Sequence, residues 1–207
     1  MIARKRATRT LAALIGLAFL SGCIDILPGS GPAAKLYTLS PKSTFNDSLP
    51  PVDWQLVVEL PIGAETLNTP RIALSRMPLT LDYYGGSRWS ERAPVMVQTL
   101  LVESFENTGR IVAVARKSTD LRADYVLKTD LREFQAEYKG DGPPIVHVKI
   151  NAKLIKMPQR TIIASFKSER KIQAVGTNVI EIIRAFDKAL GKVLKEVVEW
   201  ALAAPSE

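Results

Sequence analysis

Two residue types that often carry out chemistry each occur once in this sequence of 207 residues, as Cys23 and His147. A thiolate is a strong nucleophile near neutral pH and forms a thioether readily. One histidine and one distant cysteine supply neither the ligands of a zinc site nor the partners of a catalytic triad. His147 lies on the polar face of a predicted strand, and we predict that it faces solvent. The pattern therefore favours covalent modification of Cys23 over catalysis.

The remaining sequence gives little sign of an active site. It has no Gly-x-Ser-x-Gly elbow, no phosphate-binding loop and no Gly-x-Gly-x-x-Gly fingerprint. The stretch Gly85-Gly86-Ser87 lacks the strand-to-helix context of a nucleophile. Asp120 and Asp124 are close enough in sequence to pair, but solvated loop carboxylates are the simpler interpretation. We therefore predict no catalytic residue, no metal site and no cofactor.

The sequence before Cys23 is typical of a secretory signal. Within this signal, the ten residues Leu11–Leu20 are all apolar except for Gly16. This run is too short to span a bilayer. Leu20-Ser21-Gly22-Cys23 resembles the lipobox of bacterial lipoproteins. The resemblance implies a diacylglycerol thioether on Cys23, cleavage between Gly22 and Cys23, and fatty acylation, such as palmitoylation, of the new amino terminus. The alternative is a plain signal peptide, residues 1–22, followed by a chance cysteine. The basic residues that open the signal are Arg4, Lys5, Arg6 and Arg9.

Two or three acyl chains would hold the mature protein at a membrane, since a single chain binds only marginally. In many Gram-negative lipoproteins an Asp directly after the modified cysteine retains the protein in the inner membrane. Here Ile24 follows Cys23, and Asp25 comes one position later. We therefore expect the protein on the periplasmic face of the outer membrane, with the inner membrane as the alternative.

The composition fits one exported domain. Removing residues 1–22 leaves 185 residues, and the mature chain has 24 Lys and Arg against 21 Asp and Glu, because four of the 28 basic residues belong to the signal. A net charge near +3 does not favour a nucleic-acid partner. With Cys23 modified, no disulfide can form, so the core alone must stabilise the fold. Residues 23–34, with Pro28-Gly29-Ser30-Gly31-Pro32, are predicted to be a flexible tether and residues 35–207 a single domain.

Alternating apolar residues predict a sheet. Three long segments, 123–138, 145–157 and 161–172, are expected to form an antiparallel meander with one wet face. The apolar set of the first of these changes phase near Arg132-Glu133, which predicts a β-bulge. The Gly85-Gly86 pair is expected to end a strand. The shorter predicted strands are 35–39, 54–60, 71–75, 79–84 and 111–115.

Two segments show helical periodicity, 92–107 and 178–203. For the first, Ser90 is the expected N-cap, Pro94 suits the first turn and Gly109 the end. For the second, Asn178 and Glu181 have capping-box spacing. Its apolar stripe could serve a membrane surface or a partner, but covering the dry face of the sheet is the simpler role. The predicted fold is α+β, a mostly antiparallel sheet with two main helices packed on one face.

One stretch, Leu81–Pro94, combines aromatic and arginine side chains, the types enriched in binding hot spots. We predict that a partner binds there, at Tyr84, Arg88, Trp89 and Arg92. The alternative is that the aromatic rings of Tyr83 and Trp89 plug the edge of the core while the arginines pair locally.

Several motifs in this order resemble the ABC-type transport auxiliary lipoprotein family. The resemblance covers most of the mature chain, although the family commonly has Ala where Gly85, Gly86 and Ser90 stand. The matching motifs are Tyr37-Thr38-Leu39, Arg71-Ile72-Ala73-Leu74, Leu81-Asp82-Tyr83-Tyr84, Arg88-Trp89, Arg92-Ala93-Pro94, Leu100-Leu101-Val102-Glu103, Gly109-Arg110 and Ala123-Asp124-Tyr125-Val126-Leu127.

The resemblance implies an envelope lipoprotein that works with an ABC permease and an MCE-domain substrate-binding protein. Such systems move phospholipid or other hydrophobic compounds between the inner and outer membranes. The resemblance carries over no catalytic residue. The alternative function is a periplasmic shuttle that binds lipid itself, which would need an apolar cavity between the helices and the sheet.

Overall fold

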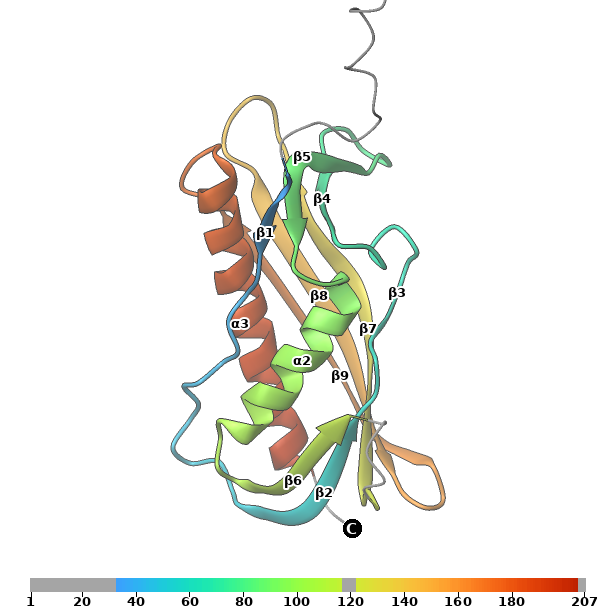
Figure 1. Ribbon diagram of the computed structural model, residues 1–207. Coiled ribbons are helices and arrows are strands. Elements are labelled where there is room, and N and C mark those ends of the chain that lie inside the picture. Colours follow the sequence, from blue (N-terminus) through green and yellow to red (C-terminus); the bar gives the residue numbers. More distant parts are fainter. Residues whose placement is uncertain (1–32, 117–121, 205–207) are drawn as a thin grey trace, which may run out of the picture. The chain divides into compact units, whose positions relative to one another are not determined.

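The computed structural model describes residues 33–116 and 122–204, within a compact unit of Ala34–Glu207. The predicted signal peptide, Cys23, Asp120 and most of the predicted tether lie outside the described residues. The described chain forms a sheet of nine strands and two helices (Figure 1). The strands are β1 (Lys35–Tyr37), β2 (Val52–Val58), β3 (Ile62–Gly63), β4 (Arg71–Ser75), β5 (Asp82–Trp89), β6 (Ile111–Arg116), β7 (Tyr125–Glu137), β8 (Ile145–Lys156) and β9 (Thr161–Gln173).

The sheet is organised along β7. One edge of β7 pairs in turn with β2, β3 and β4, all parallel to it and in the order of the chain. The other edge pairs with β8 along its whole length, and β8 pairs with β9. β5 extends the sheet from β4, β1 from β5 and β6 from β2. The α+β prediction is confirmed, and the sheet is mixed, not purely antiparallel, because β7 also pairs with three parallel strands.

The long strands match their predicted pattern. β7, β8 and β9 form the antiparallel meander, and the register shift between Leu131 and Glu133 is the predicted bulge. The bulge matters for packing because it changes which alternate residues of β7 face the helices. As a result Leu127, Leu131 and Phe134 are all buried on one side, although they do not share a single period of two.

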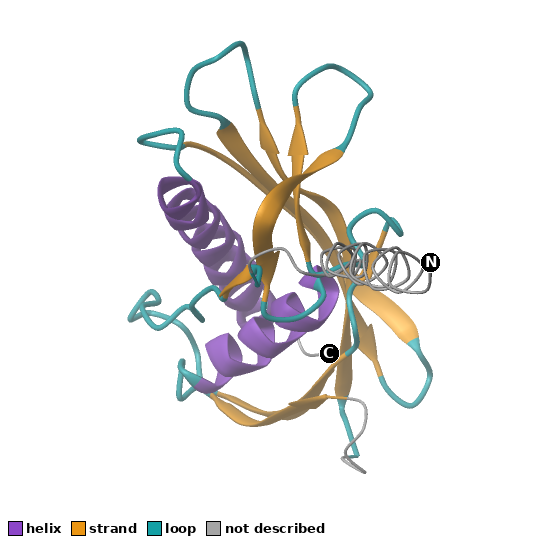
Figure 2. Ribbon diagram, turned by 45° about the horizontal axis from the view of Figure 1, so that its top comes forward, coloured by secondary structure: helices purple, strands orange, loops and turns teal. Residues whose placement is uncertain are grey.

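Both helices cover the same face of the sheet, α2 (Ala93–Glu106) and α3 (Val179–Ala203) (Figure 2). The predicted stripe of α2, Val97, Leu101 and Phe105, is fully buried. In α3 the side chain of Asn178 accepts a hydrogen bond of 3.0 Å from the backbone nitrogen of Glu181, as the capping motif predicts. Thus α3 buries its apolar face against the protein's own sheet.

An aromatic cluster joins the two layers. The rings of Trp89 in β5, Phe134 in β7 and Phe186 in α3 have centroids 5.1–5.6 Å apart. Edge-to-face and tilted contacts at these distances are favourable beyond the area they bury. The three side chains therefore tie the helix to two separate strands.

Two local predictions near α2 are wrong. Ser90 is not the N-cap: its backbone nitrogen donates to Tyr37 across the β1–β5 pair, and Arg92 occupies the N-cap without a side-chain bond. The strand predicted over 79–84 instead runs through Gly85-Gly86 to Trp89. Gly86 takes φ of +64°, and the β4–β5 register shifts between Arg71 and Ala73, so the glycines bend the strand instead of ending it.

Candidate functional site

The predicted partner surface divides between core and surface. Trp89 is only 1% exposed, in the aromatic cluster, so its inclusion in an exposed surface is wrong and the alternative, a plug of the core, holds. Arg88, the residue before it, points to the opposite face of β5 and is exposed, as is Arg92 at the start of α2. Successive side chains of a strand point to opposite faces of the sheet, so Arg88 is exposed while Trp89 faces the core.

Tyr84 is half-buried and belongs to a different contact. Its hydroxyl lies 2.8 Å from the hydroxyl of Tyr138, at the end of β7. Burial, together with the Tyr138 hydrogen bond, raises the pKa of Tyr84 well above its usual range. The adjacent Tyr83 stacks under the guanidinium of Arg71, 3.7 Å from the ring centroid. These tyrosines join β5 to its neighbours, and Arg88 and Arg92 are the exposed part of the predicted surface.

His147 is not exposed, contrary to the prediction. It is 6% exposed on the helix-free face of the sheet, between β7 and β9. Its Nδ1 lies 2.6 Å from Glu137 Oε1 and its Nε2 lies 2.9 Å from Glu169 Oε1. Both ring nitrogens thus face carboxylate oxygens, an arrangement that is satisfied when both carry hydrogen. The long side chains of the two flanking strands enclose the ring.

An ion-pair network extends from this histidine. Lys171 lies 3.5 Å from Glu137, and Lys149 and Lys167 each lie 3.4 Å from Glu169. The hydrogen bond from His147, together with Lys167 and Lys149, lowers the pKa of Glu169 to about 2 despite some desolvation. At Glu137, desolvation raises the pKa, but His147 and Lys171 outweigh it and the pKa is lowered overall.

Glu133, Glu137 and His147 each offer a ligand atom, and these atoms lie within 4.8 Å of one another. Three such donors are a set from which zinc sites are built. Here Glu137 already pairs with His147 and Lys171, and Gln135 donates to Glu133 over 2.6 Å. The arrangement is a neutralised hydrogen-bond and ion-pair network, and it directs neither nitrogen of His147 toward a serine or threonine. Asp124, the other acid singled out in the sequence, accepts a hydrogen bond of 2.8 Å from the backbone nitrogen of Gln55.

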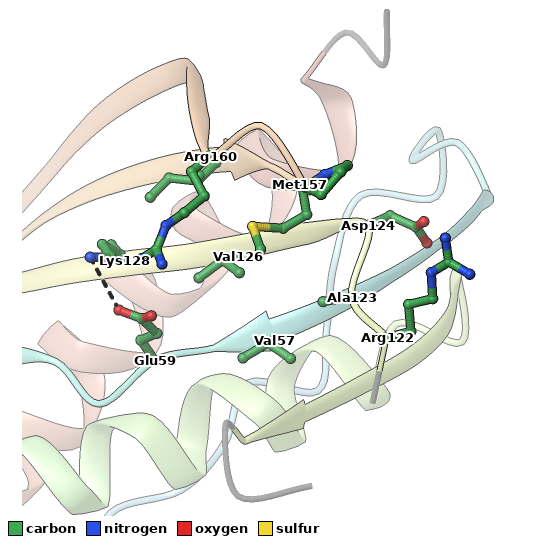
Figure 3. A pocket seen from close by; sticks show the side chains of 11 residues that line it. Val57, Glu59, Arg122, Ala123, Asp124, Val126, Lys128, Met157 and Arg160 are labelled. Carbon is green, nitrogen blue, oxygen red and sulfur yellow. Dashed lines mark ion pairs between the residues drawn. The ribbon is translucent and has the colours of Figure 1, made fainter. Parts of the chain in front are cut away.

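A groove of about 420 Å³ lies on the same helix-free face of the sheet, over β2, β7 and β8 (Figure 3). Its floor is part of an aliphatic row that crosses five paired strands in register. Figure 3 shows Met157 directed toward Val126, the Lys128–Glu59 ion pair at one end and Asp124 with Arg122 at the other. The volume is within the usual range of small-molecule sites. The row consists of Ala115, Val57, Val126, Ile155 and Ile162.

Two arginines stand at the rim of the groove. Within residues 33–116 and 122–204, neither Arg122 nor Arg160 has an ion-pair partner. Arg160 also has a positive φ of 59°, in the β8–β9 connection. An apolar floor beside guanidinium groups suits a molecule with a hydrocarbon part and an anionic head. By contrast, side chains such as Leu127 and Phe134 are buried in the described interface between sheet and helices, where the alternative shuttle function would need a cavity.

These sites could be found from the sequence only in part. Glu133, Gln135 and Glu137 alternate along one strand, as do His147 and Lys149 along the next, so each set shares a face. What the sequence does not provide is the register of the hairpins, which brings Gln135 opposite His147 and His147 opposite Lys171. The groove was missed because Val57, Val126 and Ile155 look like ordinary strand residues.

The fold and its surface define a two-layer α+β domain with an apolar groove and an ion-pair network on the helix-free face of its sheet. The model of the ABC-type transport auxiliary lipoprotein component family matches residues 37–198, and the chain belongs to this family. No described helix combines the length and the apolar character required to cross a bilayer.

Three individual proteins are similar to this chain. A crystal structure of a Xanthomonas campestris protein of the DUF330 family is 33% identical, with a TM-score of 0.78, and the match covers 83% of this chain and 96% of that one. A second solved structure, of an uncharacterized protein, shares the fold with a TM-score of 0.66 at 13% identity, over 82% of this chain and 99% of that one. An uncharacterized protein of Bradyrhizobium diazoefficiens is 26% identical over 189 residues, 89% of this chain. The chain spans about half the length of that curated relative.

The carboxylates around His147 predict a defined acid sensitivity. Glu169 has a pKa of about 2 when folded against 4.5 ordinarily, so the unfolded chain takes up its proton first as the pH falls. Its stabilising contribution is therefore complete above pH 4.5 and is lost as the pH falls toward about 2. We expect Glu169→Gln to flatten the dependence of the unfolding free energy on pH in this window, measured by chemical denaturation. Glu91→Gln is the control, because Glu91 is an exposed acid. The prediction is contradicted if the unfolding free energies of wild type and Glu169→Gln change equally with pH between 4.5 and about 2.

Proposed function

We propose that this protein is an accessory component of an MCE and ABC-type transport system that moves phospholipid or another hydrophobic compound between the inner and outer membranes. Membership of the transport auxiliary family over residues 37–198 carries the proposal. The lipobox-like sequence before Cys23 supports an anchor, and Ile24 after it supports the outer membrane. In this role the protein is non-enzymatic: the anchor holds it in the periplasm and the folded domain binds the MCE-domain protein.

The proposed docking surface consists of Arg88 and Arg92, the two exposed residues of the partner surface predicted within Leu81–Pro94. Both guanidinium groups lie near the β1–β5 edge, where β1 leaves one side of the sheet unpaired among the described strands. Their charge suits an acidic surface on the partner, and such complementarity sets partner choice and association rate. Tyr84 contributes by holding β5 in place through Tyr138.

Reversing these two charges is expected to weaken docking. Arg88→Glu with Arg92→Glu should lower co-purification with the MCE-domain protein at least about tenfold, as loss of a hot spot does. Lys188→Glu with Lys192→Glu is the matched control, because both lysines are exposed on α3. A circular dichroism spectrum and a thermal melt confirm folding of each variant. Equal recovery of partner by the two double variants would show that the docking surface lies elsewhere.

The anchor has its own test. We expect metabolic labelling with a palmitate analogue to mark the wild-type protein and to place it in the outer-membrane fraction, because Cys23 is the one thiol in the sequence. Cys23→Ala should abolish both the label and the membrane fractionation, while the domain still folds. Unlabelled wild-type protein in the producing organism would refute the anchor.

The groove over Val126 favours a second candidate function, binding of an amphiphile by the domain itself. A hydrocarbon chain would lie on the aliphatic row, with its anionic head beside Arg122 or Arg160. This is the lipid shuttle suggested by the sequence, moved from the interior to the helix-free face.

A fluorescent fatty acid separates this candidate from pure scaffolding. We expect cis-parinaric acid to bind the wild-type domain and Val126→Asp to raise its Kd about tenfold or more, because the carboxylate would sit without a partner on the apolar floor. Lys153→Glu, at an exposed residue of β8 outside the groove, should leave the Kd unchanged. Binding that is equally strong in Val126→Asp would contradict the groove as the site.

A further inference from the structure

Three connections lie together at one end of the domain, near the top of Figure 1: β4–β5, β7–β8 and β9–α3. The backbone nitrogen of Tyr138 donates to Ser75 over 2.8 Å, and that of Ala174 donates to Pro144 over 2.9 Å. The guanidinium of Arg76 lies 4.4 Å from the centroid of the Tyr138 ring. These contacts link the first connection to the second and the second to the third.

This end exposes large apolar side chains. Met77 is 64% exposed, Val175 87%, and Leu79 is fully exposed. Met77 and Leu79 belong to the β4–β5 connection and Val175 to the β9–α3 connection. Single exposed apolar residues are common on protein surfaces, but three large ones at the same end of a domain make that end a candidate interaction site.

The backbone presents Leu79 outward in an unusual way. Leu79 has a φ of +65°, a left-handed conformation that residues with large side chains rarely adopt. Three hydrogen bonds to the carbonyl oxygen of Met77 hold the turn: from the Ser75 hydroxyl at 3.0 Å, the Thr80 hydroxyl at 2.8 Å and the Thr80 backbone nitrogen at 3.3 Å. Such a conformation persists where the surrounding structure enforces it, and it is concentrated at functional sites.

The same end is the one nearest the start of the folded chain. β1 runs parallel to β5, with Lys35 opposite Ser87 and Tyr37 opposite Trp89, so the N-terminal end of β1 lies on the side of the β4–β5 connection. Lys35 comes twelve positions after Cys23, and a chain of that length spans at most about 43 Å. The 13-residue strand β7 alone is about 43 Å long. The chain that leads back to Cys23 thus enters the domain from the side of this end, which places the end within reach of a membrane that holds the anchor.

We infer that Met77, Leu79 and Val175 rest in the interfacial region of a phospholipid bilayer, so that the domain stands on the membrane by this end. The inference rests on the anchor proposed above. Exposed cations beside the apolar tips, Arg76 and Lys139, are placed for phosphate headgroups. Apolar side chains with flanking cations are the usual composition of interfacial contacts.

A fluorescent label tests the contact in the mature, lipidated protein. Because Cys23 is the one cysteine and carries the lipid, Leu79→Cys introduces a single free thiol for an NBD label. Val112→Cys is the matched control: Val112 is 65% exposed, on β6 at the other end of the domain in Figure 1. Both proteins are reconstituted in vesicles of phosphatidylethanolamine and phosphatidylglycerol.

We expect the label at position 79 to shift its emission to the blue and to be quenched about threefold more by brominated lipids than the label at position 112, as befits a depth of about 5–10 Å. Vesicle-bound protein with equal quenching at both positions would overturn the inference and leave the anchor intact. Failure of the protein to associate with vesicles would refute the anchor and the inference together. A blue shift at position 79 that requires the MCE-domain protein would show that a protein, not the bilayer, covers this end.

Discussion

Backbone hydrogen bonding along both edges of β7 is the constraint on which the rest of the structure depends. One edge is satisfied by β8 over its whole length, and the other by three short strands placed one after another. The bulge after Leu131 lets the same strand pack Leu127 and Phe134 against the helices. The helices, the aromatic cluster, the groove and the His147 network all take their positions from this strand.

The parts of the fold that depend on local periodicity were predictable. The meander, its bulge, the buried stripe of α2 and the Asn178 cap follow from residue spacing within single elements. The parallel pairings of β2, β3 and β4 with β7 were not, because nothing in a short strand indicates its direction or partner. His147 was misplaced for a related reason: its strand face was identified correctly, but the covering side chains come from β7 and β9, whose registers the sequence does not give.

The chain belongs to the transport auxiliary lipoprotein family, and its described surface combines charged, aliphatic and apolar regions. Both ring nitrogens of His147 face glutamates, and these glutamates form ion pairs with lysines. Trp89, which was predicted to lie in the partner surface, is buried in the core. What remains at the surface is spatially divided: arginines near the β1–β5 edge, an aliphatic groove on the helix-free face and apolar loop tips at one end. We propose one of these surfaces for a partner, one for an amphiphile and one for a membrane.

The stacking of β2, β3 and β4 along a strand that comes much later in the chain also governs how the protein is made. The backbone nitrogen of Gln55 donates to Asp124, 69 residues away, so β2, β3 and β4 lack this shared neighbour until β7 has been made. Contacts of such long range slow folding and leave unpaired edges exposed in the meantime. Assembly should therefore begin with the β7–β9 hairpins, whose partners are neighbours in sequence, and β2, β3 and β4 should join the sheet only after that template exists.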